Sequence, residues 1–386
     1  MKFIAILFLL LTGFTGFSQI INYTPSFVCN LSDTTLESSG LIYVNKTLWT
    51  HNDSGGKPEL YQTDTLTGFV KRTVKIKNTT NIDWEDLAQS TTHIYIGDFG
   101  NNYGNRTNLR IYRISKLDLL NPINDSILAD SIKFYYQDQT VFTSTLNATN
   151  YDGEAFIFKN DSLHLFSKSW LTQNTKHYIL PATIGNHTAV LVDSIYVDGL
   201  ITSAGINQIN GNIVLLGYKK VGFNYNCFAW LFYNYTSHNY FKSNKKRLEL
   251  GVASTLGQTE GIVIKNDNSG YFSSEKIVTS LFTIPPQLYK FNFNSYFTTT
   301  GVNEINNNLA FKVYPNPTKE NIIVDLPNSQ TPFTLKLFNI NGDNVYHELI
   351  VEEKQKIINL KKIVPGIYFL KLENAATIFT QKIIIE

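Results

Sequence analysis

The 386-residue chain is poor in cysteine and in charge. Its two cysteines, Cys29 and Cys227, argue against a metal centre built from several thiolates. Charged residues make up 17% of the chain, and the formal net charge is +2. So balanced a charge gives no field that would favour nucleic acid or an anionic membrane as a partner. Two alternatives stay open for the cysteines, a disulfide and two buried thiols.

Three common catalytic motifs are also missing. The chain has no Gly-x-Ser-x-Gly elbow, no His-Glu-x-x-His pair and no phosphate-binding loop. These absences argue against a serine hydrolase of the elbow type, a zinc peptidase and a nucleotide-binding loop.

Long apolar runs are absent except at the start. Lys2 precedes an apolar stretch, and Gly16 and Ser18 stand where a signal peptidase prefers small residues. We therefore expect residues 1–18 to be a signal peptide that is cut before Gln19. The mature chain has no run that could form a transmembrane helix.

Strand signals dominate what remains. Phe and Tyr are frequent, at 26 and 22 residues, and short β-branched and aromatic runs alternate with Asn, Asp, Gly and Ser. We expect an all-β protein with a body over residues 19–300, an Asn-rich linker over 301–310 and a tail over 311–386.

Five segments of the body begin in a similar way, with Glu or Ser followed by small and then apolar residues. They are Glu37-Ser38-Ser39-Gly40-Leu41, Trp84-Glu85-Asp86-Leu87-Ala88, Asp152-Gly153-Glu154-Ala155-Phe156, Thr202-Ser203-Ala204-Gly205-Ile206 and Thr259-Glu260-Gly261-Ile262-Val263. Repeats of about 50 residues with three or four strands each are typical of β-propeller blades. The count predicts five blades, or six if the longest interval hides one. The segment Ile20 to Cys29 would supply the last blade's missing strand. A β-sandwich is the alternative fold.

Propeller geometry predicts where chemistry would gather. The start of each innermost strand and the loop between the second and third strands lie on one face. This face would hold Glu37, Glu85, Glu154 and Glu260, whose carboxylates suit Ca²⁺ or Mg²⁺. Further binding candidates from the loops are Asn52, Asp98, Asn101, Asn102, Arg106, Lys168 and Lys219. The alternative is that these groups cap strands or pair with one another.

His51 and Asp53 are the catalytic candidates of the same face. His51 is the best general base if the protein hydrolyses a substrate, and Asp53 stands two residues away. A loop histidine can equally be an ordinary surface group, so the sequence leaves open whether the protein is an enzyme.

The tail resembles the type IX secretion C-terminal sorting domain of Bacteroidetes. The matching segments are Val313-Tyr314-Pro315-Asn316-Pro317, Phe338-Asn339-Ile340-Asn341-Gly342, Pro365-Gly366-Ile367-Tyr368 and Lys382-Ile383-Ile384-Ile385-Glu386. Their alternation predicts a small half-buried sandwich, with a tight turn at Asn341-Gly342. The resemblance implies that residues 311–386 engage the type IX secretion machinery. The protein would then be secreted or held on the outer surface of a Gram-negative bacterium.

The body resembles, over shorter motifs, the SdiA-regulated and the esterase-like, phytase-like propellers. The motifs are those around Glu37, Glu85, Glu154 and Glu260, and the fourth repeat departs from them with Ser203. This resemblance implies a calcium-supported propeller that hydrolyses esters or phosphoesters. Three hypotheses follow: a propeller whose axial face binds a small-molecule or surface ligand, a calcium-dependent hydrolase, and a structural or adhesive surface protein.

Overall fold

The computed structural model describes residues 21–142, 144–222, 224–279, 283–298, 312–326, 332–351, 354–374 and 378–386. The expected signal peptide and the expected linker lie outside these residues. The chain divides into two units, Met1–Thr298 and Thr299–Glu386. Each unit is described by itself below.

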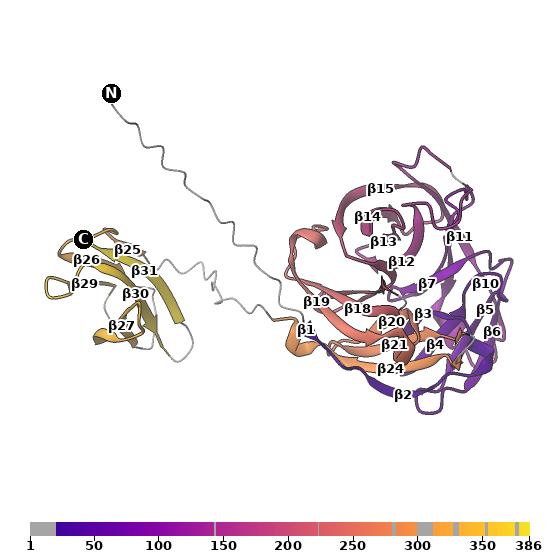
Figure 1. Cartoon of the computed structure of the whole chain (residues 1–386), viewed down its shortest axis with the longest axis horizontal. Coiled ribbons are helices and arrows are strands. Elements are labelled where there is room, and N and C mark those ends of the chain that lie inside the picture. The colour runs from indigo at the N-terminus through magenta and orange to yellow at the C-terminus, as the bar shows by residue number, and fades with distance from the viewer. Residues whose placement is uncertain are drawn as a thin grey trace, which may run out of the picture. The chain divides into compact units, whose positions relative to one another are not determined.

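The first unit is a five-bladed β-propeller (Figure 1). The innermost strands contact one another in the cyclic order β3, β7, β12, β16, β20 and again β3. From the axis outwards, blade 1 is β3 (Ser38–Val44), β4 (Thr47–Asn52), β5 (Glu59–Thr63) and β6 (Val70–Lys77). Blade 2 is β7 (Trp84–Gln89), β8 (His93–Asp98), β9 (Arg110–Ser115) and β11 (Asp130–Tyr136). Blade 3 is β12 (Asp152–Lys159), β13 (Ser162–Lys168), β14 (Asn174–Pro181) and β15 (Gly185–Tyr196).

The remaining blades complete the ring. Blade 4 is β16 (Leu200–Ile206), β17 (Ile213–Val221), β18 (Asn224–Tyr233) and β19 (Asn244–Val252). Blade 5 is β20 (Gln258–Ile264), β21 (Ser269–Glu275), β24 (Gln287–Asn292) and β2 (Ser26–Asn30). The N-terminal strand β2 thus closes the last blade, as the sequence predicts. Short elements join the blades: α1 (Lys116–Leu120), α2 (Ala253–Leu256), η1 (Asp33–Thr35), η2 (Tyr240–Lys242), η3 (Asn294–Tyr296), β22 (Ile277–Val278) and β23 (Thr283–Ile284).

Parallel pairing covers most of the outer edges of the blades. Strand β10 (Ser126–Leu128) pairs with β6, β1 (Ile21–Asn22) pairs with β19, and β11 pairs with β15. These pairs use backbone groups that would otherwise be open to another chain. The long interval between the second and third repeats holds α1 and β10, so no sixth blade is present there among the described residues.

The hydrophobic core follows the ring. Five clusters of buried side chains each lie between two neighbouring blades, for example around Trp49 and Tyr112 between blades 1 and 2. Each blade buries its apolar faces only by packing against its neighbours, which is why the ring must close.

Every innermost strand carries a β-bulge at the repeated motif. The register shifts between Ser38 and Leu41, Trp84 and Leu87, Gly153 and Ala155, Ile201 and Ser203, and Thr259 and Ile262. An extra residue in one strand re-aims the side chains around it. The repeat that the sequence presents as Glu or Ser followed by small residues is therefore a structural device that directs polar groups toward the axis.

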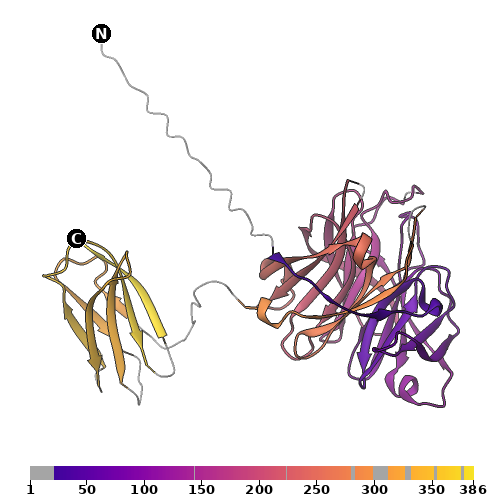
Figure 2. The ribbon, with the colours of Figure 1, turned by 60° about the horizontal axis from the view of Figure 1, so that its bottom comes forward.

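The second unit is a small β-sandwich (Figure 2, orange to yellow). One sheet holds β25 (Lys312–Tyr314), β26 (Asn321–Asp325) and β29 (Gln355–Asn359). The other holds β27 (Phe333–Asn339), β28 (Asn344–Ile350), β30 (Gly366–Glu373) and β31 (Ile378–Ile385). Alternate residues such as Ile322, Val324, Leu335 and Leu337 form its core. The turn between β27 and β28 has Gly342 at φ 88°, as Asn341-Gly342 predicts.

Two further sequence questions are answered by this fold. Cys29 lies in blade 5 and Cys227 in blade 4, and both are free, buried thiols. Among the described residues, none of the helices has the length and apolar composition that crossing a bilayer requires.

Candidate functional site

The site lies at the end of the ring where the innermost strands begin. A pocket of about 660 Å³ opens there, and strand starts from several blades meet the loops that follow β4, β8, β13 and β17. Its lining includes Asp53, Glu85, Asn102, Glu154, Lys168, Trp170, Tyr218, Lys219, Lys220, Tyr225, Gln258 and Glu260. The pocket therefore combines carboxylates, ammonium groups and aromatic rings from all five blades.

Two groups of three carboxylates include the lining residues Asp53, Glu85 and Glu154. The first is Asp53, Asp83 and Glu85, and the second is Glu85, Asp152 and Glu154. Within each group, the ligand oxygens lie within 4.8 Å of one another. Both groups use Glu85, so an ion held by either group would depend on the same carboxylate.

Glu85 is the most unusual member of the set. Its side chain is 3% exposed, and none of the hydrogen bonds or ion pairs found among the described residues involves its carboxylate. Burial, together with the charges of Asp53 and Glu154, holds the pKa of Glu85 well above its usual range. A buried carboxylate without a donor is costly, which makes this one a strong candidate for a missing cationic ligand.

The pKa values of the neighbouring carboxyls are raised for the same reasons. Burial and the Asp83 charge hold the pKa of Asp53 well above its usual range. Burial and the Asp152 charge raise the pKa of Asp83 to about 6. Burial and the Glu260 charge raise the pKa of Glu275 to about 9. Burial and repulsion between neighbouring carboxylates are thus the common cause of these raised pKa values.

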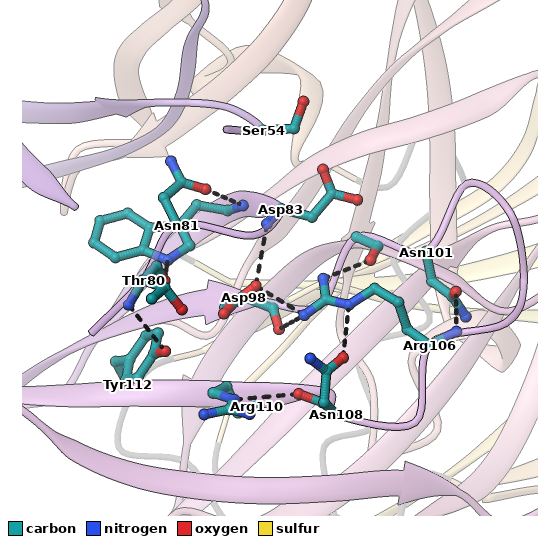
Figure 3. A network of polar contacts seen from close by, with 12 residues as sticks. Ser54, Thr80, Asn81, Asp83, Asp98, Asn101, Arg106, Asn108, Arg110 and Tyr112 are labelled. Atoms are coloured by element: carbon teal, nitrogen blue, oxygen red, sulfur yellow. Dashed lines mark hydrogen bonds and ion pairs between the residues drawn. The ribbon is translucent and has the colours of Figure 1, made fainter. Parts of the chain in front are cut away.

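The loop after β8 positions Asp83 (Figure 3). The backbone N–H of Asp83 donates to Asp98 Oδ1 at 3.1 Å, while its carboxylate points away from Asp98 and Arg106. Arg106 binds Asp98 at 2.9 Å and the Gly100 carbonyl at 2.7 Å, which fixes the loop. A Cβ at Gly100 would lie 2.0 Å from Glu85 Oε1 and 2.4 Å from Asp83 Oδ2. Only glycine lets the loop pack this closely on both carboxylates.

Lys168 and Trp170 contact the second carboxylate group. Lys168 is buried at the end of β13, and its Nζ lies 2.9 Å from Glu154 Oε1. Trp170 Nε1 donates to Asp152 Oδ2 at 2.8 Å, and the Asn101 N–H donates to Asp152 Oδ1 at 2.5 Å. These contacts hold the second carboxylate group in place.

A second buried acid, Asp86, lies deeper on the axis. Its Oδ2 accepts from the N–H groups of Phe156 and Ala204 at 3.1 and 3.0 Å. Its Oδ1 accepts from Ser203 Oγ and from its neighbour Leu87 N–H, both at 2.9 Å. Ser203 Oγ in turn accepts from Ile262 N–H at 3.0 Å. This network, which we call the axial lock, joins blades 2 to 5.

The structure brings many of the sequence-predicted residues together. Asp53, Glu85, Asn102, Glu154, Lys168, Lys219 and Glu260 line one pocket. Lys219 also pairs with Asp198 at 2.6 Å, toward the rim. The prediction that strand starts and loops converge on one face therefore describes the observed pocket.

Other predicted residues lie outside the pocket lining. Glu37 is exposed, and Asn52 uses its amide oxygen and nitrogen to hold the backbone at Glu37 and Thr34. Asn101, Asp98 and Arg106 bond one another or the loop backbone rather than facing the pocket.

His51 also lies outside the lining. Its imidazole is fully buried against Trp84, and its Nδ1 lies 2.9 Å from the Asn52 carbonyl. Burial lowers the pKa of His51 to about 4. This position gives the imidazole no access to a molecule in the pocket, so we do not give His51 a role in the function proposed below.

Three acids of the site escape the sequence reasoning: Asp83, Asp152 and Asp86. A signal was present for two of them, because Asp83 precedes Glu85, and Asp152 precedes Glu154, by two residues. Residues two apart in a strand share a face, so this Asp-x-Glu pattern in two repeats indicates paired carboxylates. Asp86 had no comparable signal, because its orientation depends on the bulge.

Comparison with known families identifies the tail. Residues 312–386 match the family described as the secretion system C-terminal sorting domain. The chain is therefore an exported β-propeller protein, either secreted or held at the outer cell surface of Bacteroidetes. No curated protein matches the chain significantly.

Solved structures resemble the chain only in overall fold. An exo-β-1,3-galactanase from Phanerochaete chrysosporium, solved with galactose, is 13% identical with a TM-score of 0.42; the match covers 88% of this chain and 93% of that one. Hydrazine synthase from Kuenenia stuttgartiensis is 10% identical with a TM-score of 0.30, covering 67% and 77%. Similarities this low carry no argument about activity.

Proposed function

We propose that the pocket binds a calcium ion between Asp53, Asp83 and Glu85, and that the exported propeller uses this face to bind its ligand. The observation that carries the proposal is the buried Glu85 carboxylate, which has no donor among the described residues and belongs to both carboxylate groups.

The donor chemistry fits a hard divalent cation. Every candidate ligand is a carboxylate oxygen, and calcium accepts six to eight oxygens in flexible arrangements, whereas magnesium demands a near-octahedral set. A bound cation would also relieve the repulsion that raises the pKa of Glu85 and Asp83. Neither a thiolate nor an imidazole stands in either group, which argues against zinc.

The rest of the pocket suits a polar ligand. Its volume of about 660 Å³ exceeds what one ion requires. Tyr225, Lys220 and Trp170 also line the pocket and offer aromatic and basic contacts. A calcium ion would supply an electrophilic centre for the ligand's oxygen atoms, while these side chains orient its remaining groups.

Calcium binding is tested on the chain that begins at Gln19, by thermal unfolding and by titration calorimetry. Calcium at about 100 times its Kd should stabilise the protein by about 2.7 kcal/mol, and chelator should reverse the gain. Glu85→Gln should abolish the gain. Asp267→Asn removes a carboxylate at the opposite end of the ring and should leave it intact. An equal calcium response from Glu85→Gln and the unaltered chain would refute the proposal.

Hydrolysis is a second candidate, and Asp83 is the residue that favours it. A carboxyl with a pKa of about 6 can exchange a proton near neutral pH, as general acid–base catalysis requires. A panel of ester and phosphoester substrates, assayed with and without calcium, tests this function. Turnover that needs calcium and is lost in Asp83→Asn would support it. Absence of turnover across the panel would leave ligand binding as the function.

A further inference from the structure

We propose that Lys168 is a built-in cation that occupies a second cation position of the pocket, so that the native site takes one divalent ion beside Glu85 and not two. This inference rests on the proposed function, because it assigns the stoichiometry of the same site. Lys168 would then determine how many divalent ions the pocket binds.

The position of Lys168 is that of a bound ion rather than a surface group. Its side chain is 7% exposed, and its Nζ lies 2.9 Å from Glu154 Oε1. The ammonium also stands over the rings of Trp170 and Tyr218, at 5.0 and 5.6 Å from their centroids. A carboxylate and two aromatic faces make a cage for a cation, and here the cation is supplied by the chain itself.

The charges around Lys168 divide the pocket into two halves. Burial disfavours the ammonium, but Glu154, Tyr218 and Glu260 hold the pKa of Lys168 well above its usual range. The half beside Lys168 contains Glu154 and Glu260, and Gln258 Nε2 donates to Glu260 Oε1 at 2.6 Å. The other half contains Asp53, Asp83 and Glu85, for which no ion pair is found among the described residues. One half therefore contains a cation supplied by the chain, and the other is left for an ion.

Removing the ammonium should expose the second position. Lys168→Met keeps an unbranched side chain of similar length but leaves Glu154 and Glu260 without their cation. Two carboxylates in a buried pocket then either take up a proton or bind a second divalent ion. Lys168→Arg keeps the positive charge and should preserve the native stoichiometry.

The experiment is calcium titration calorimetry at pH 7.5 on four proteins that begin at Gln19. We expect one calcium per chain in the unaltered protein and in Lys168→Arg, and two in Lys168→Met. The matched control is Lys176→Met. Lys176 also pairs with an acid, Asp138 at 2.6 Å, and stands over a ring, Tyr151 at 4.2 Å, but it lies outside the pocket. This control should bind one ion.

The outcomes separate this inference from the proposed function. If Lys168→Met binds only one ion, at any affinity, the inference is wrong, because removal of the ammonium would then have opened no second cation position. No ion in the unaltered chain overturns the proposed function and with it the native stoichiometry of one, whereas a gain of one ion in Lys168→Met would still show that Lys168 occupies a cation position. If Lys168→Met folds poorly in chelator, refolding in calcium chloride or methylammonium chloride provides the second measurement. Rescue by either cation supports a cation position, and rescue by neither refutes it.

Discussion

The two ends of the ring of innermost strands differ in chemistry, although the same five strands build both. Where β3, β7, β12, β16 and β20 begin, the pocket is lined by buried carboxylates and Lys168. Where they end, a hollow of about 370 Å³ is lined mainly by apolar groups such as Leu41, Phe156 and Val263, with Lys265 and Asp267 among its few charged residues. The axial lock around Asp86 lies between the two ends.

This difference arises from the bulges and not from composition alone. After each bulge the strands alternate regularly, so their apolar residues fill the spaces between blades and the far end of the axis. At the bulge, an added residue turns Glu85, Glu154 and Glu260 inward. A propeller can therefore carry a charged site at one end while its core stays apolar, provided that the irregularity is confined to the first residues of each innermost strand.

The largest expected effect comes from breaking the axial lock that separates the two ends. Asp86→Ala would leave the buried N–H groups of Phe156 and Ala204 and the Ser203 hydroxyl without their acceptor. Each orphaned buried group costs about 1–3 kcal/mol, so we expect a loss of about 4 kcal/mol or more in the free energy of unfolding. Urea unfolding in the presence of chelator measures it. Asp267→Asn, at the apolar end, should change stability by no more than about 0.5 kcal/mol. Similar small losses in both variants would show that the lock is not needed.

The next largest effect should be a weaker affinity for calcium when Gly100, which packs against two carboxylates at the acidic end, is replaced. Gly100→Ala would place a methyl group 2.0 Å from Glu85 Oε1 and force the carboxylates of Glu85 and Asp83 apart. Disturbing groups that orient metal ligands typically weakens affinity by about 10–100-fold, and we expect a calcium Kd raised by that factor. Titration calorimetry provides the measurement. Gly205→Ala is a glycine control at the apolar end, since its φ is not positive and an added methyl group would lie 3.3 Å from its nearest neighbour, Ile264. An unchanged Kd in Gly100→Ala would argue that the ion lies elsewhere.

The same contrast explains what could be predicted from the sequence. The strands of the tail and of the blades were predictable because apolar–polar alternation and turn residues such as Asn341-Gly342 determine local structure within a few residues of the sequence. The five repeats also predicted the blade count and the closing strand, since each blade must bury both faces. Glu85, Glu154 and Glu260 were predictable as members of one face because they occupy equivalent positions in their repeats.

The rest depended on contacts between distant residues. The sequence pattern places Glu37 with Glu85, yet the bulge gives that position to Ser39, and Glu37 precedes the bulge and stays exposed. His51 was chosen for its chemistry, but alternation along β4 sends it toward Trp84 in the core between blades 1 and 2. Asp86 looks like an ordinary strand acid until blades 3 and 4 bring their N–H groups to it. The pattern and spacing of residues in the sequence do not predict these contacts between blades.

A smaller effect should appear when the acidic end loses a charge without any ion present. Burial and nearby carboxylates raise the pKa of Glu85, so its ionised form opposes folding in the absence of calcium. Glu85→Gln should therefore raise the melting temperature in chelator by a few degrees, equivalent to about 1 kcal/mol, although it abolishes the response to calcium. Glu59→Gln, outside the pocket, serves as the control for a change of Glu to Gln. A lower melting temperature for Glu85→Gln in chelator would mean that a donor from the protein already satisfies this carboxylate.

The smallest effect is a pH dependence that the acidic end should have and the apolar end should lack. Asp83 has a pKa of about 6 in the folded state, above the ordinary value of about 3.9 expected on unfolding. Between these values the folded chain holds the extra proton, so its contribution to stability without calcium falls as pH rises from about 4 to about 6. Calcium binding needs the ionised carboxylate, so its affinity should rise about tenfold per pH unit up to about pH 6 for this proton alone.

Calcium titrations from pH 5 to 8 measure this slope, and calorimetry in buffers of different ionisation enthalpy counts the protons released. Asp83→Asn should flatten the slope below pH 6, whereas Asp267→Asn should keep it. If Asp83→Asn kept the slope of the unaltered chain, Asp83 would not contribute its carboxylate to the ion. The ion would then depend on Glu85, Asp152 and Glu154, the group next to Lys168. In that case the calcium ion and the Lys168 ammonium would share Glu154, and Lys168→Met should tighten the single site rather than create a second one.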